Sequence, residues 1–155
     1  MKGKGIVGFI LGAAFVGGVV AYMKEKEIKK QRDNSVKYLT LFREMNQYVV
    51  TKQLNKEIKN YFIDKGYKSI AIYGMSHIGQ RLIDDLEDTE IEVLYGIDRR
   101  AERMTYELDI YNPEDDLPEV DAIIVTSYDF TEIRELLEEK VDCDIISFDE
   151  IIFAL

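Results

Sequence analysis

The segment after Gly66 restricts the fold most, because short apolar runs alternate there with segments whose apolar residues recur every three or four positions. Near-continuous apolar runs predict strands buried on both faces, and the intervening periodicity predicts helices. Strands joined in this way form a parallel sheet with helices on its two faces. The expected strands are Ser69–Tyr73, Ile91–Ile97, Leu108–Tyr111, Val120–Thr126 and Asp144–Phe148, and the expected helices are 77–87 and Phe130–Lys140, the latter with Asp129 and Glu132 as its capping pair.

The first strand ends in the turn GMSHIG, from Gly74 to Gly79. In the dinucleotide fingerprint three glycines allow a tight turn, a close approach of the pyrophosphate and close packing of the helix, whose N-terminus attracts phosphate. Gly74 and Gly79 take the first and third places of this fingerprint, and Ser76 takes the second. The Ser76 side chain narrows the space beside the phosphates, but its hydroxyl can donate a hydrogen bond to them. Asp98, at the exposed C-terminal end of the second strand, is placed to accept hydrogen bonds from ribose hydroxyls. The sequence therefore predicts an α/β fold with a small Rossmann-like parallel sheet of about five strands and a nucleotide site at this turn.

Two chemically reactive side chains occur once each. His77 lies in the glycine turn, where it would either donate to a ligand or act as a general acid, or lie exposed at the start of a helix. We include it among the binding residues and assign no catalytic residue. Cys143 excludes an internal disulfide and a Cys-rich zinc site, and its place at the start of a strand predicts a core thiol. No spacing of side chains resembles a metal site.

The run from Gly5 to Met23 contains nineteen residues and no charge. A helix of this length is about 28 Å long, close to the hydrocarbon thickness of a bilayer. Five basic residues follow within Lys24–Arg32, against two lysines before the run, so we expect a single-pass anchor in the cell membrane with a cytoplasmic C-terminal domain. The alternatives are a cleaved signal peptide, with Val19 and Ala21 before the cut, and a buried core helix.

Small residues within this run are spaced for close contact between two membrane helices. Gly8 and Gly12 form a small-xxx-small pair, which predicts a homodimer, although glycine is also simply common in membrane helices. Charge limits the other partners. Residues 84–155 carry 24 acidic and 5 basic side chains, a net charge of −19 that would repel a phosphate backbone, so we expect no nucleic-acid partner.

The connecting segment, residues 24–66, contains no proline and no glycine before Gly66. We expect one or two amphipathic helices that end at Gly66. The apolar face would pack on the following domain, an arrangement that we favour over a parallel coiled coil extending the membrane dimer. Its residues are Val36, Leu39, Phe42, Met45 and Val49, followed by Leu54, Ile58, Tyr61 and Phe62. The expected organisation is thus an anchor (1–23), a connecting helix (24–66) and an α/β domain (67–155).

Several segments in order carry a resemblance to a known family: NYFIDKGYKSIAIYGMSHIGQRLIDDL, EIEVLYGIDRR, LPEVDAIIVTSYDF and IISFDEII. From about Tyr38 to Leu155 the chain resembles a bacterial Rossmann-like domain family related to nucleotide-sugar epimerases. In that family the domain stands alone or is fused to proteins of capsule and other surface-polysaccharide synthesis. The resemblance implies polysaccharide-biosynthesis proteins as partners. The family's turn usually reads GxGxxG, and Ser76 departs from it.

These observations favour a membrane-anchored binding module for a nucleotide, nucleotide sugar or dinucleotide, accessory to envelope polysaccharide synthesis. The identity of the cofactor stays open, with NAD and a nucleotide sugar as the candidates. The alternative is a non-catalytic, membrane-tethered interaction protein whose nucleotide site has degenerated. Whether the chain is an enzyme stays open. An epimerase or reductase needs a catalytic pair and a substrate lid, for which residues 67–155 leave no room unless a partner subunit supplies them.

Overall fold

The computed structural model describes the backbone of residues 3–155 and the side chains of residues 20–155. The chain divides into two compact units, residues 1–40 and 41–155. Helix α1 runs from Gly3 to Gln53, and helix α2 from Lys59 to Lys65. Gly66 ends α2 in the left-handed conformation, with φ of 79°, and its N–H donates to the carbonyl of Ile63. The predicted helical connection and its end at Gly66 are therefore confirmed.

The predicted membrane anchor lies mostly outside the described side chains. Among the residues that the structure describes, no helix combines the length and the apolar character needed to cross a membrane. Within the run Gly5–Met23, the side chains of residues 5–19 are not among those described, and these include the Gly8 and Gly12 pair. The anchor and the contact through its small residues stay predictions.

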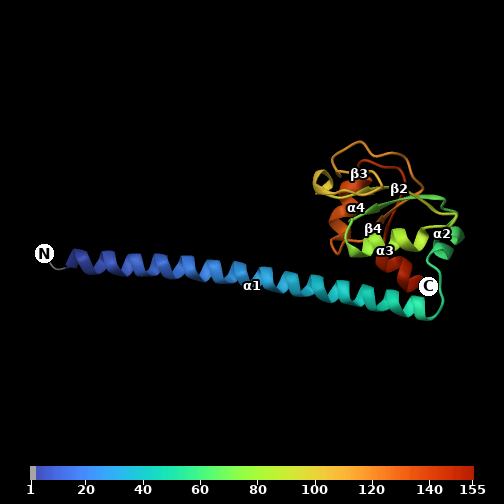
Figure 1. Cartoon of the computed structure of the whole chain (residues 1–155). Helices are drawn as coiled ribbons and strands as arrows, with labels where there is room; N and C mark the ends of the chain where they lie inside the picture. Colours follow the sequence, from blue (N-terminus) through green and yellow to red (C-terminus); the bar gives the residue numbers. More distant parts are fainter. Residues whose placement is uncertain (1–2) are drawn as a thin grey trace. The chain divides into compact units, whose positions relative to one another are not determined.

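The second unit contains the predicted sheet (Figure 1). Its strands are β1 (Ser69–Tyr73), β2 (Glu92–Ile97), β3 (Ile110–Tyr111), β4 (Ala122–Val125) and β5 (Asp144–Ser147), with helices α3 (His77–Leu86), α4 (Phe130–Glu138) and α5 (Phe148–Ala154) and a short 3₁₀ helix at Ala101–Arg103. All paired strands are parallel, in the order β3-β2-β1-β4-β5. The α/β class and the five-stranded parallel sheet are confirmed.

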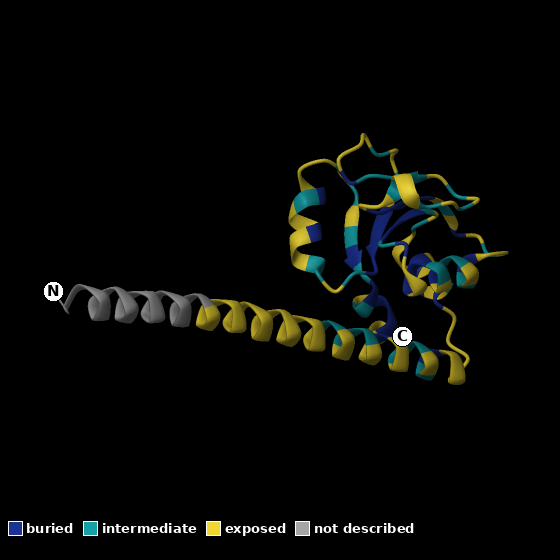
Figure 2. Ribbon diagram, turned by 60° about the vertical axis from the view of Figure 1, so that its left-hand side comes forward, coloured by how far each residue is buried: buried dark blue, intermediate teal, exposed yellow. Residues whose placement is uncertain are grey.

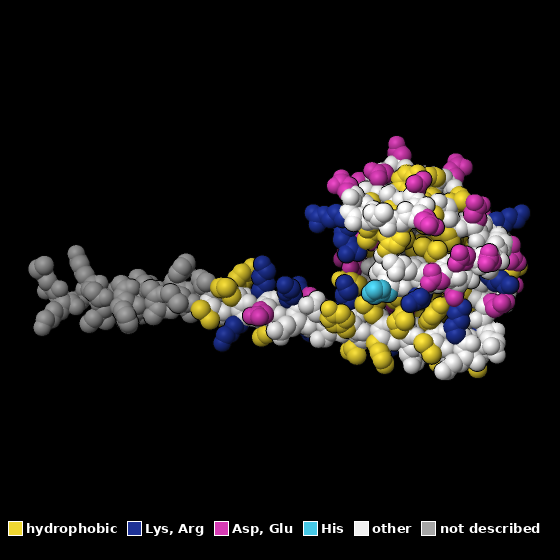
Figure 3. Space-filling view, in the orientation of Figure 1, with side chains coloured by type: hydrophobic (Ala, Val, Ile, Leu, Met, Phe, Trp, Pro, Cys, Tyr) yellow, Lys and Arg dark blue, Asp and Glu magenta, His cyan; other side chains and the backbone are white. Residues whose placement is uncertain are grey.

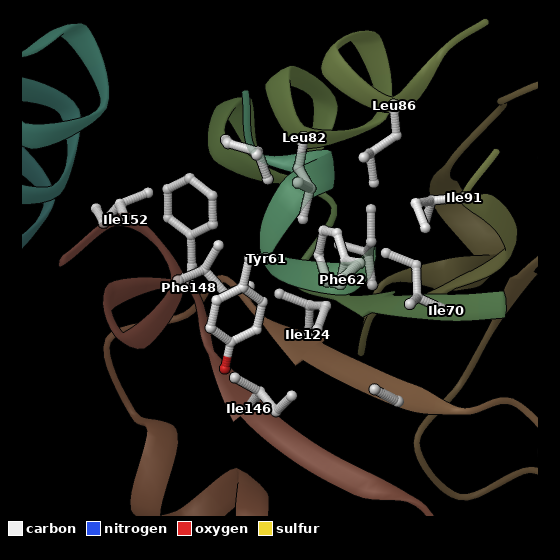
Figure 4. Packing of buried hydrophobic residues seen from close by; sticks show 14 of the residues in the cluster. Tyr61, Phe62, Ile70, Leu82, Leu86, Ile91, Ile124, Ile146, Phe148 and Ile152 are labelled. Carbon is white, nitrogen blue, oxygen red and sulfur yellow. The ribbon is translucent and has the colours of Figure 1, made fainter. Parts of the chain in front are cut away.

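The sheet has a helical layer on each face, because successive side chains of a strand point to opposite sides. On one face Ile70 and Ile72 of β1 pack with residues of α2, α3 and α5 (Figure 4). On the other face Ala71 and Tyr73 pack with Ile133 of α4 and its neighbours. Figure 2 shows the result as a buried sheet between half-buried helices. Burial on both faces explains why these strands read as near-continuous apolar runs.

Two local expectations are wrong. Helix α5 begins at Phe148, which the sequence pattern assigned to the last strand, because the Ser147 hydroxyl accepts the N–H of Glu150 at 3.1 Å and caps a new helix. The capping pair at the start of α4 does not form either. Asp129 is the N-cap residue, but its φ and ψ of −87° and 40° are not extended and its side chain makes no capping hydrogen bond.

The apolar stripe of α1 does not pack as we favoured. Phe42, Met45 and Val49 are 69%, 37% and 46% exposed. Within the second unit, a different face of α1 is covered by the domain: Leu41 and Tyr48 pack against the core cluster, and Glu44 and Thr51 are buried. From Ile58 onward the pattern behaves as predicted, since Ile58, Tyr61 and Phe62 are in the core.

Glu44 is an unusual residue in this covered face, because it is 5% exposed and its Oε2 atom has no hydrogen-bond partner among the residues that the structure describes. Burial raises the pKa of Glu44 to about 7, and the negative charge of Asp149 on α5 adds to the increase. Burial raises the pKa of Asp149 as well, and Arg43 acts in the opposite direction on it. Two carboxyl groups thus lie close enough to influence each other where α1 packs against α5.

Glu44 should make stability depend on pH. Its pKa is 4.5 in the unfolded reference and about 7 in the folded chain, so the folded state binds the proton more tightly. The contribution of Glu44 to stability should be greatest below about pH 4.5 and fall as the pH rises through 7. In the full chain, Glu44→Gln should raise the free energy of unfolding at pH 8 by about 1–3 kcal/mol and change it little at pH 4, as measured by chemical denaturation. The exposed Glu135→Gln is the matched control; an equal gain for Glu44→Gln at both pH values would contradict this account.

Candidate functional site

The candidate site lies where the strand order reverses. From β1 the chain passes to β2 and β3 on one side of the sheet, and β4 and β5 lie on the other side. In parallel sheets the crevice outside the carboxyl ends of the strands at such a reversal is the usual place for a ligand. Gly74 follows β1, Asp98 follows β2 and Thr126 follows β4. The fold therefore brings two of the predicted residues, Gly74 and Asp98, to this edge.

Gly74 occupies a position that only glycine fits. Its φ is 98°, in the region that side chains rarely adopt, and a Cβ atom there would lie 2.8 Å from the Thr126 hydroxyl. That hydroxyl donates to the Gly74 carbonyl at 2.6 Å, and the Gly74 N–H donates to the Ile97 carbonyl at 2.8 Å. Hydrogen bonds from β2 and β4 thus hold the turn that leaves β1.

Gly79 brings helix α3 against this turn. A Cβ atom at Gly79 would lie 2.4 Å from the carbonyl oxygen of Gly74, too close for any other residue without movement of the backbone. Gly79 is buried, as a contact between helix and turn requires. The two glycines therefore do here what the first and third glycines of the dinucleotide fingerprint do: they allow a tight turn and close packing of the helix.

Ser76 and His77 are exposed at the start of α3. Ser76 is the N-cap residue, and its side chain makes no capping hydrogen bond. The N–H groups of His77, Ile78 and Gly79 form the first turn of the helix, and none of them has an acceptor among the residues that the structure describes. The only histidine lies at the surface beside this turn (Figure 3). The start of α3 therefore presents free donors to solvent.

Asp98 is not exposed as expected: it is 8% exposed. Its Oδ2 accepts the N–H of Met75 at 3.2 Å, and its Oδ1 accepts the N–H and Nε–H of Arg100 at 2.9 and 3.2 Å. The glycine turn and the segment after β2 therefore cover it from two sides. A carboxylate offers about four acceptor positions, so this arrangement leaves room for a ribose hydroxyl, but Asp98 already fastens the turn to the end of β2.

Three further residues shape the site and were missed in the sequence. Thr126 holds Gly74 from β4. Arg100 binds Asp98. The hydroxyl of Tyr106, on the loop after β2, donates to the Met75 carbonyl at 3.3 Å and accepts from Gln80 at 2.7 Å. Thr126 could have been found as the first polar residue after a buried strand, whereas nothing in the pattern marks Tyr106.

The remaining candidates lie away from this edge. Cys143 is half-buried beside the core cluster of the α4 face, and burial raises the pKa of its thiol. Cys143 helps to line a surface cleft formed by residues before β4 and β5, at the opposite end of the strands, and none of the five predicted binding residues lines this cleft. Within the described part of the chain, no group of three or more His, Cys, Asp or Glu side chains could hold a metal ion.

Comparison of the chain with protein-family models, curated proteins and solved structures finds no significant match. The resemblance to the epimerase-related domain family therefore stays a prediction. What supports a function is the strand order and the geometry of the glycine turn.

The contact of Gly79 with Gly74 should make Gly79→Ala costly. The new methyl group would press on a backbone oxygen, and we expect the free energy of unfolding to fall by about 1–3 kcal/mol or more. Gly66→Ala is the comparison, because a Cβ atom at Gly66 meets nothing within 4 Å, so that its cost comes only from the positive φ of 79°, which Gly79 does not share. Thermal denaturation of the full chain should show a larger loss for Gly79→Ala. A wild-type stability of this variant would refute the close contact.

Asp98 should matter for stability as well as for any ligand. Asp98→Ala leaves the Met75 N–H without its acceptor and Arg100 without its ion pair, so we expect a loss of about 1–3 kcal/mol in the free energy of unfolding. Asp98→Asn keeps one acceptor oxygen and should lose less. Urea denaturation of the three chains measures the difference. Equal stability of wild type and Asp98→Ala would show that Asp98 does not hold the turn.

Proposed function

We propose that residues 67–155 form a Rossmann-like domain that binds a nucleotide, a nucleotide sugar or a dinucleotide such as NAD at the turn Gly74–Gly79. The observation that carries the proposal is the start of α3. Gly74 and Gly79 leave no room for a side chain inside the turn, while three N–H groups of the first helical turn have no acceptor among the described residues. A phosphate group would satisfy these donors and interact favourably with the helix dipole.

The charges around the two helix starts at this edge favour α3 over α4. The first turn of α3 carries no acidic side chain, and the exposed Ser76 hydroxyl is free to donate to a phosphate oxygen. Helix α4 starts with Asp129 as its N-cap and has Glu132 in its first turn. These two carboxylates would repel an anion, so the phosphate is expected at Ser76 and His77.

The sugar end of the ligand would lie toward β2. There Asp98 offers its one remaining acceptor position, and Arg100, whose side chain is 64% exposed, adds a positive charge. A ribose hydroxyl would donate a hydrogen bond to Asp98, and an additional phosphate would form an ion pair with Arg100. This pair supports a nucleotide rather than a ligand that consists of phosphate alone.

We propose binding rather than catalysis as the activity. His77 is exposed and no second acid or base lies beside it in the turn, so the arrangement offers no pair for proton transfer. The uncharged run Gly5–Met23 and the resemblance to the epimerase-related family support a membrane-anchored, cytoplasmic module that serves envelope polysaccharide synthesis.

A second function is favoured by a different observation. Both oxygens of Asp98 already have partners within the chain, and Ser76 stands where the fingerprint has glycine. An Asp98 carboxylate already occupied within the chain fits an interaction protein whose nucleotide site has degenerated.

Substitutions at Ser76 separate the two functions without disturbing the fold, because this side chain is exposed and unbonded. Isothermal titration calorimetry of the full chain with NAD, UDP-glucose and coenzyme A should show binding tighter than millimolar for one of them. Ser76→Gly should tighten it, since the middle glycine allows a closer approach of the phosphates. Ser76→Asp should weaken it at least tenfold by charge repulsion while preserving stability, because Asp is a good N-cap residue.

The outcome that rejects nucleotide binding is equally clear. If none of the three ligands binds below millimolar and Ser76→Gly changes nothing, the turn serves only the fold. The interaction protein then replaces our proposal. Loss of binding in Ser76→Asp together with loss of stability would point instead to a structural role of Ser76.

A further inference from the structure

The exposed face of α1 carries a row of large apolar side chains within the second unit. We call Phe42, Met45 and Val49 the α1 seam. Phe42 and Val49 are 69% and 46% exposed, whereas another face of the same helix is covered by the domain. Rows of exposed apolar side chains usually mark a surface that another molecule covers.

The spacing of the seam is that of a two-helix interface. Phe42, Met45 and Val49 follow one another by three and four residues, the a, d and a positions of a heptad, and Tyr38 continues the pattern four residues earlier. The face of α1 that the domain covers, Leu41, Glu44, Tyr48 and Thr51, is centred about 110° away around the helix axis. A second helix on the seam would therefore leave the packing of α1 on the domain unchanged.

Charge in the sequence points to a second copy of this chain as the occupant. In the heptad that the seam defines, Glu27 is at position g and Arg32 at the following e position. Two parallel copies in register would place each Glu27 beside Arg32 of the other copy. Between residues 25 and 53, no other g position and the e position that follows it both carry a charge. A shift of one heptad would instead bring Glu27 toward Glu25 of the other copy. Charge thus favours one alignment.

We infer that the protein forms a parallel, in-register homodimer through the α1 seam. The four apolar side chains from Tyr38 to Val49 would bury on the order of 800 Å² over both copies, which is less than a stable, specific interface buries. The dimer is therefore weak by itself and depends on concentration. Confinement to a membrane by the N-terminal run would strengthen it by raising the effective concentration.

Cysteine cross-linking of the full chain tests the alignment directly. The test uses a Cys143→Ser background and three single variants, Phe42→Cys, Met45→Cys and Val49→Cys. Each should give a disulfide-linked dimer under mild oxidation in the cells that produce the protein. The reason is that residues at a and d positions face their own counterparts in a parallel pair of helices. Arg43→Cys is the matched control, because Arg43 is exposed on the same turn but points away from the seam. It should cross-link at least about tenfold less.

The same scan distinguishes the other occupants. An antiparallel pair would cross-link at no more than one of the three positions, and a different protein on the seam would give a reducible band of another mass. Either result overturns the proposal, as does equal cross-linking at Arg43→Cys. In the Met45→Cys chain, Phe42→Ser with Val49→Ser should lower the dimer yield at least about tenfold. Both side chains are exposed, so the fold should be kept, and an unchanged yield would also reject the seam.

Discussion

The contact between Gly79 and the carbonyl oxygen of Gly74 is the constraint on which the α/β unit depends. With a hypothetical Cβ atom only 2.4 Å from that oxygen, α3 can approach β1 only because residue 79 has no side chain. Met75, in the same turn, lies in the core and is 2% exposed. Met75 packs closely on a glycine in β2, since a Cβ atom at Gly96 would lie 2.6 Å from its sulfur and could fit only if Met75 and Ile110 moved. Three glycines and one methionine thus fix how helix, turn and sheet fit together.

The strands and the long helices could be predicted because their signals are local. Burial on both faces gives each strand a short apolar run, and β1 matches its expected range from Ser69 to Tyr73. Helix α5 was missed because seven residues give too little periodicity and Phe148 continues the apolar run of β5. The covered face of α1 was also misassigned. Periodicity shows that a helix is amphipathic, whereas the partner of each face depends on residues far away in the sequence.

The site was predictable in its backbone and not in its hydrogen bonds. Gly74 and Gly79 follow from the needs of a turn and a close helix, which are short-range requirements. The surroundings of Asp98 come from Met75 and Arg100, so its burial could not be derived from its place at the end of a strand. The polar residues that complete the site, Thr126 and Tyr106, come from different loops, and only the assembled sheet brings them to one edge.

The charge of the α/β unit bears on how two copies could associate. Residues 84–155 have a net charge of −19, and acidic side chains are spread over the visible face of this unit (Figure 3). Two such units placed in contact would repel each other strongly at low ionic strength. A seam on α1, on a face of the helix that the domain leaves free, allows two helices to join without requiring direct contact between the acidic surfaces. An interface on a helix outside the sheet therefore suits this charge distribution better than one on the domain itself.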